Sequence, residues 1–166
     1  MINCLFIIAL KNLREIAGRI NKPFAYDEIL AETKENAKAV FYDKKASAYA
    51  LTQGGKEFTA LGNALAILSG LADNADALCE KIAKDELSGC SLSMKCFKYD
   101  ALLLTNKEKW QEQVLNEIRK DYKKMLESGA TSVWETIDGA SAFDNAGSLC
   151  HGWSAIPVYY LSELKI

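Results

Sequence analysis

The sequence predicts an all-α protein built from antiparallel helix hairpins, with about seven helices. Only two of its 166 residues are proline, and apolar residues make up 49% of the chain. Through most of the chain these apolar residues recur every three or four positions, which is the period of an amphipathic helix. Short turns separate the helical segments, and short connections favour antiparallel neighbours. No linker or low-complexity segment interrupts the chain, so we expect residues 1–166 to form a single domain.

The expected helices begin and end at local turn and capping signals. The first ends at Asn21-Lys22-Pro23, Asp27 is expected to cap the second, and Asn74 is expected to cap the fourth. A short extended segment, 47–51, precedes Gly54-Gly55. The predicted helices lie at about 2–20, 27–41, 57–71, 74–87, 93–104, 108–127 and 152–164.

The helices alternate between two kinds of surface. The third is apolar nearly all round, through residues such as Phe58, Leu61 and Leu65, which predicts burial on more than one side. The sixth carries an apolar stripe from Trp110 to Met125, and we expect its Lys- and Glu-rich face to lie in solvent. The alternation indicates an inner and an outer layer of helices, as in a solenoid or a toroid.

The apolar run at residues 1–10 is interpreted as part of a core helix. No basic residue precedes it, no small-residue cleavage site follows it, and Lys11 and Arg14 interrupt it. The run is also too short to span a bilayer. We therefore expect no membrane partner and a cytoplasmic location.

Composition argues against several functional classes. The net charge is −2 and the basic residues are scattered among acidic ones, so we expect no nucleic-acid partner. Five cysteines without CxxC spacing and a single histidine do not form a zinc motif. We expect reduced thiols, several of them packed in the core, with no metal and no cofactor.

Two late segments carry the chemistry. Residues 129–135 read Gly-Ala-Thr-Ser-Val-Trp-Glu, and residues 151–155 read His-Gly-Trp-Ser-Ala. The flat apolar face of an indole suits the C–H face of a sugar, and a neighbouring carboxylate can act as acid, base or nucleophile. The pattern therefore predicts a carbohydrate site that contains Trp134, Glu135, His151 and Trp153.

Each candidate residue also has a structural interpretation. Glu135 could be a surface carboxylate beside a helix, His151 a helix cap, and Trp153 a core aromatic. Asn63 lies inside an apolar run, where its amide must find partners in a sugar hydroxyl or in the backbone. A helical scaffold in which both tryptophans are core residues is the corresponding alternative for the whole chain.

At these motifs the chain resembles the C-terminal half of the catalytic domain of bacterial α-L-rhamnosidases, which are six-hairpin glycosidases. The similar segments are 6–18, 63–71, 129–135 and 148–155. The resemblance implies an (α/α)6 toroid in which Glu135 is the general base that activates water for an inverting attack. It also implies that His151 and Trp153 line the pocket of a terminal L-rhamnose or a related sugar.

The chain departs from that family in its missing half. The segment that supplies the general acid, Asp-Gly followed by Glu, has no counterpart here, and seven helices cannot close a ring of about twelve. We expect a partial toroid that is inactive or weak alone. Apolar faces at its edges, such as Leu5 to Ile16, predict a homo-oligomer or pairing with an N-terminal half-domain. A non-catalytic helical carbohydrate-binding or protein-interaction module is the alternative.

Overall fold

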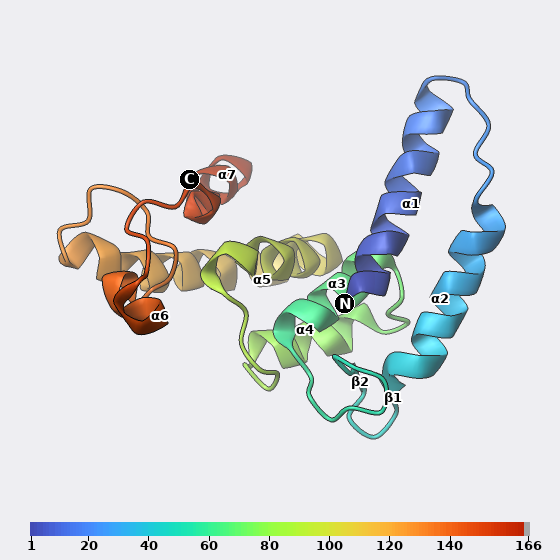
Figure 1. The fold of residues 1–166 in the computed structure, drawn as a ribbon, viewed down its shortest axis with the longest axis horizontal. Coiled ribbons are helices and arrows are strands. Elements are labelled where there is room, and N and C mark those ends of the chain that lie inside the picture. The colour runs from blue at the N-terminus through green and yellow to red at the C-terminus, as the bar shows by residue number, and fades with distance from the viewer. Residues whose placement is uncertain (165–166) are drawn as a thin grey trace. The chain divides into compact units, whose positions relative to one another are not determined.

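The computed structural model describes residues 1–164 and confirms the all-α class (Figure 1). The chain divides into two compact units, Met1–Gly89 and Cys90–Ile166. Among the described residues, seven α-helices and one two-stranded sheet form. Seven helices were expected, but the predicted fifth and sixth are both part of α5, and the short α6 was not predicted. None of these helices combines the length and the apolar character needed to cross a bilayer. The expectation of a single domain stays a prediction.

The first unit contains four helices and a small antiparallel sheet. The sheet pairs Tyr42 with Tyr49 and Asp43 with Ala48, which places a strand within the predicted extended segment. The elements are α1 (Ile2–Arg19), α2 (Asp27–Phe41), β1 (Tyr42–Asp43), β2 (Ala48–Tyr49), α3 (Ala60–Ser69) and α4 (Ala75–Ala83).

Helix α3 is the centre of the first unit and packs against α1, α4 and β2. Seven of its ten residues are buried, which confirms the predicted burial on more than one side. Gly70 ends the helix with φ of 75°, a left-handed conformation that glycine adopts readily. The Lys11 ammonium donates to the carbonyls of Leu68 and Ser69 at 3.3 and 3.4 Å, where a cation is favoured by the helix dipole.

Helix α1 buries only one of its two apolar faces, although the sequence predicted a core helix. Leu5, Leu13 and Ile16, on the face expected at an edge of the partial toroid, are 43%, 44% and 54% exposed. The face that packs inside the unit consists of Cys4, Ile7, Leu10 and Ala17. Both sets recur at helical spacing, so periodicity shows that the helix is amphipathic but does not select the buried face.

The predicted caps were half correct. Asn74 caps α4, since its Oδ1 accepts a hydrogen bond from the N–H of Ala77 at 3.0 Å. Asp27 is the first residue of α2 rather than its cap, a position held by Tyr26. The Asp27 carboxylate instead accepts from Arg14 of α1 at 3.3 Å. An acidic residue in the first turn still favours the helix through its dipole.

The second unit is built on a long helical element that folds back on itself. Its elements are α5 (Lys95–Glu127), α6 (Ala142–Asn145) and α7 (Ile156–Glu163), with 3₁₀ turns at Leu92–Met94, Gly139–Ser141 and Gly152–Ser154. Within α5, Asn106 is extended, with φ of −158° and ψ of 95°, and its Oδ1 accepts from the N–H of Lys109 at 3.0 Å. This break separates two helical arms that match the predicted fifth and sixth helices.

A buried ion cluster joins the two arms of α5. Lys95 lies 2.5 Å from Asp121 and 2.8 Å from Glu117, and Lys98 lies 2.9 Å from Glu117. These side chains are between 6% and 18% exposed. The expectation that the charged face of the sixth helix lies in solvent is therefore wrong for Glu117 and Asp121. Each of them has a cationic partner on the other arm.

Candidate functional site

The two motif segments predicted from the sequence lie side by side in the second unit. The N–H of His151 donates to the carbonyl of Val133 at 2.9 Å, and the N–H of Glu135 donates to the carbonyl of Ser148 at 2.9 Å. The Ser132 hydroxyl also donates to the carbonyl of Leu149 at 2.5 Å. Backbone pairing therefore brings the carboxylate-bearing segment and the histidine-bearing segment together.

The Glu135 carboxylate is anchored at one of its two oxygens. Its Oε2 accepts a hydrogen bond from the N–H of Ser148 at 3.2 Å, and the residue is half-buried. Within residues 1–164, Oε1 accepts no hydrogen bond. The Ser148 backbone therefore holds the carboxylate through its N–H and the Glu135 main chain through its carbonyl, which fixes the direction of the side chain.

Trp134 packs against the loop that connects the two motifs. A Cβ atom on Gly139 would lie 2.7 Å from Cε3 and 2.8 Å from Cζ3 of the Trp134 ring, closer than such atoms approach. Gly139 also has φ of 58°, a conformation that favours glycine. The indole of Trp134 thus fixes the loop in place, a structural role beside its predicted contact with sugar.

His151 and Trp153 form an aromatic pair at the surface. Trp153 is 68% exposed, so it is not a core residue. The half-buried His151 ring lies 6.3 Å from it, with an angle of 61° between the rings. His151 occupies the N-cap position of the following 3₁₀ turn, but its side chain makes no capping hydrogen bond. The indole of Trp153 is therefore accessible at the surface beside the His151 ring.

The loop between the motifs is closed by a tight backbone contact. A Cβ atom on Gly147 would lie 2.0 Å from the carbonyl oxygen of Gly139, so only glycine fits there. Phe143, Asp144 and Asn145 have positive φ values of 53°, 57° and 71°, which cost energy for residues with a side chain. This compact turn delivers Ser148 to Glu135. Sequence reasoning missed Ser148, because the atoms that act belong to its backbone.

Asn63 lies in the other unit and serves the backbone there. It is 0% exposed, its Oδ1 accepts from the N–H of Tyr49 at 2.8 Å, and its Nδ2 donates to the carbonyls of Tyr49 and Thr59 at 3.1 and 2.9 Å. The amide thereby ties β2 to α3. Of the two partners expected for it, the structure shows the backbone one.

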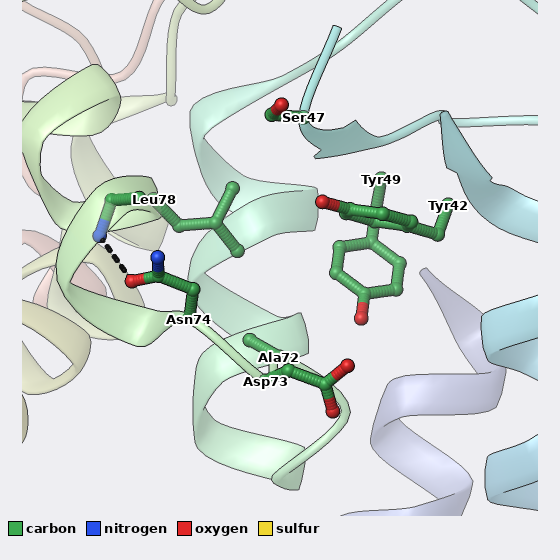
Figure 2. Close-up of a pocket in the computed structure, with 8 residues that line it drawn as sticks. Tyr42, Ser47, Tyr49, Ala72, Asp73, Asn74 and Leu78 are labelled. Atoms are coloured by element: carbon green, nitrogen blue, oxygen red, sulfur yellow. Dashed lines mark hydrogen bonds between the residues drawn. The ribbon is translucent and has the colours of Figure 1, made fainter. Parts of the chain in front are cut away.

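Two hollows in the structure do not contain the predicted catalytic residues. In the second unit an apolar groove runs beside the motif loop, between the second arm of α5 and α7, where Leu126, Val133 and Val158 line it. In the first unit a smaller pocket is lined by residues that include Tyr42, Tyr49 and Asp73 (Figure 2). Glu135, His151 and Trp153 line neither of them. The candidate site is thus a surface site in the second unit.

The part of the chain that the structure describes contains no cluster of metal-ligating side chains. No group of three or more His, Cys, Asp or Glu residues is placed to hold a metal ion there. The site consists of a carboxylate, an imidazole and two indoles, which are groups suited to binding a polar ring and to transferring protons.

Comparison with known protein families identifies the family of this chain. The family model described as the bacterial alpha-L-rhamnosidase 6 hairpin glycosidase domain matches residues 1–164. No curated protein and no solved structure matches the chain.

Proposed function

Because this chain belongs to the bacterial α-L-rhamnosidase six-hairpin glycosidase family, we propose that it carries the base-bearing half of a glycoside hydrolase site, with Glu135 as the general base. The observation that supports this most directly is the backbone pairing of Val133 and Glu135 with His151 and Ser148. The pairing holds the carboxylate and the aromatic pair on one connected piece of backbone.

In the proposed reaction, Glu135 removes a proton from a water molecule that attacks the anomeric carbon with inversion. The Ser148 N–H holds Oε2, which leaves Oε1 for the water. An inverting site needs roughly 6.5–9.5 Å between its two carboxyl groups so that the water fits beside the sugar. His151 and Trp153 would contact a terminal L-rhamnose or a related sugar, and Trp134 would support the loop.

The general acid is proposed to come from helices outside this chain. Six helix hairpins comprise about twelve helices, whereas seven form within residues 1–164. Absence of one member of an acid/base pair lowers the rate by about 10²–10⁴-fold, so the chain by itself is inactive or weak. The remaining helices would come from an N-terminal half-domain or from a second copy, and a cytoplasmic location is part of the same proposal.

Sugar binding tests the site without requiring turnover. Trp153 is exposed and Trp110 is buried, so L-rhamnose should change the fluorescence of the exposed indole and leave Trp110 unaffected. We expect a saturable change in the wild type that is lost in Trp153→Ala and retained in Trp110→Phe. A wild type that gives no response at tens of millimolar sugar would contradict the carbohydrate site and favour a protein-interaction module.

Hydrolysis separates the enzyme from a binding module. The exposed indole of Trp153 beside His151 also suits a non-catalytic sugar-binding module, which is the second candidate function. With a chromogenic α-L-rhamnoside, we expect wild-type turnover to exceed that of Glu135→Gln, which keeps the size of the side chain and removes its basicity. Equal rates for both proteins, together with intact sugar binding, would contradict hydrolysis by this chain alone and leave the binding module as its function.

A further inference from the structure

Helix α1 has a second apolar face that the rest of the first unit leaves exposed. Its exposed apolar residues are Ile2, Leu5, Phe6, Leu13, Ile16 and Ile20, which directly follows the helix. Their exposed fractions lie between 43% and 79%. A continuous apolar stripe of this kind on a soluble helix is typical of an interaction surface.

The spacing of this stripe is that of a coiled-coil seam. The seam consists of these residues without Leu5 and with the exposed Ala9. Ile2, Phe6, Ala9, Leu13, Ile16 and Ile20 follow one another at alternating steps of four and three residues. Alternating steps of four and three place the residues at the a and d positions of a heptad repeat, which face a partner helix. The positions are also symmetric about residue 11, because the order of the steps is the same from either end of the helix.

We propose that α1 is a self-association surface, on which it pairs antiparallel with α1 of a second copy of this chain about a two-fold axis near Lys11. The pairing sets Ile2 across from Ile20, Phe6 across from Ile16, and the small Ala9 across from Leu13. Each pair occurs twice, as an isologous two-fold interface requires. This inference deepens the proposed need for a partner and does not depend on the chemistry of Glu135.

The charges of α1 do not oppose such a pair. The Lys11 ammonium is directed to the carbonyls at the end of α3, Arg14 pairs with Asp27 of α2, and Arg19 pairs with Glu15 on α1 itself. Each cation thus has a partner within its own copy, and the stripe itself contains no charged residue. Two copies can therefore approach without burying an unpaired charge, which is the main electrostatic obstacle to association.

The stripe is large enough for a specific dimer. With about 200 Å² for a large apolar side chain, the exposed parts of the stripe amount to roughly 600 Å² per copy. Two copies would bury about 1,200 Å², which lies at the lower end of the range for specific interfaces. The dimer is therefore expected to form at micromolar concentration and to dissociate on dilution.

The mass of the full chain in solution tests the surface. We expect sedimentation at tens of micromolar to give a dimer of the 18.3 kDa chain. Phe6→Asp and Ile16→Asp should each weaken association by about 100-fold or more, because each places two charges in a desolvated seam. Leu104→Asp is the matched control, since Leu104 is 71% exposed but lies outside α1. Circular dichroism checks that every variant stays folded.

Crosslinking tests the direction of the pair. In a background that carries Cys150→Ser, one protein receives Ile2→Cys and another Ile20→Cys. Mixing them under oxidation should give a disulfide between the two proteins, and neither protein alone should crosslink. The proposal is overturned if the wild type is monomeric or if the dimer survives Phe6→Asp and Ile16→Asp. It is also overturned if either cysteine variant forms disulfide-linked dimers without the other. A monomer would mean that another helix covers the stripe.

Discussion

The backbone N–H of His151 donates to the carbonyl oxygen of Val133 across 2.9 Å, and this bond joins the histidine motif to the carboxylate motif. The second link, from Glu135 to Ser148, lies on the same pair of segments. The placement of the two motifs is thus set by the main chain and by the loop that connects them. Substitutions that change the path of this loop are expected to disturb Glu135 and His151 together.

Gly147→Ala should distort the site through the backbone. A methyl group at this position would lie 2.0 Å from the carbonyl oxygen of Gly139, so the loop must open. We expect a loss of about 1–3 kcal/mol in unfolding free energy, measured by urea denaturation, together with loss of the fluorescence response to L-rhamnose.

Gly89→Ala is the control for this substitution, because a Cβ atom there meets nothing within 4 Å. It should leave both the unfolding free energy and the sugar response close to those of the wild type. A Gly147→Ala protein with wild-type stability and an unchanged sugar response would show that the contact between Gly139 and Gly147 does not support the site.

The sequence predicted the pairing of the two motifs but not the atoms that produce it. Trp134, Glu135, His151 and Trp153 were selected as candidates because indoles, carboxylates and imidazoles have distinctive chemistry. The Ser148 anchor acts through its main-chain N–H, which any residue except proline provides, so no side-chain pattern could reveal it.

The fold shows the same division between local and long-range information. The break at Asn106 and the cap at Asn74 were predictable, because both depend on residues within a few positions. The buried face of α1 and the ion cluster of Glu117 were not, because each depends on a partner far away in the chain. Helical periodicity identifies an amphipathic helix, whereas tertiary packing decides which residues are buried.

The ion cluster of α5 predicts an acid-sensitive stability. Burial alone would raise the pKa of Glu117, but hydrogen bonds from Lys95 and Lys98 outweigh it and lower this pKa below its ordinary value. A carboxyl group with a lowered folded-state pKa stabilises the protein above its unfolded-state pKa of about 4.3. That stabilisation is lost as the pH falls through the folded-state value.

Glu117→Gln should therefore reduce the unfolding free energy by about 2 kcal/mol at pH 7, and the difference from the wild type should shrink below about pH 4. Urea denaturation between pH 7 and pH 3 measures both effects. Glu112→Gln, an exposed substitution on the same arm of α5, provides the control and should change little. A constant difference between wild type and Glu117→Gln across this pH range would contradict the role of the cluster.

Asn63→Ala should destabilise the first unit. It removes three hydrogen bonds and leaves the buried N–H of Tyr49 without its acceptor, for an expected loss of about 2–4 kcal/mol. Asn74→Ala removes one exposed helix cap and should cost only about 1 kcal/mol. If Asn63→Ala instead keeps wild-type stability and loses the response to L-rhamnose, the amide contacts sugar as the sequence pattern suggested.

Cys150 should be the first thiol to react with iodoacetamide. It is exposed and adjoins His151, whereas Cys4 and Cys79 are buried. Burial also raises the pKa of Cys90 to about 11 and raises the pKa of Cys4 and Cys96, which leaves little of the reactive thiolate at pH 8. We expect mass spectrometry of the native protein to find one rapidly modified site, which Cys150→Ser removes.

A sugar held between His151 and Trp153 would screen the Cys150 thiol, so saturating L-rhamnose should slow the modification and an equal concentration of glycerol should not. Several rapidly modified thiols would contradict the burial pattern, and a rate unaffected by L-rhamnose would place any bound sugar away from His151.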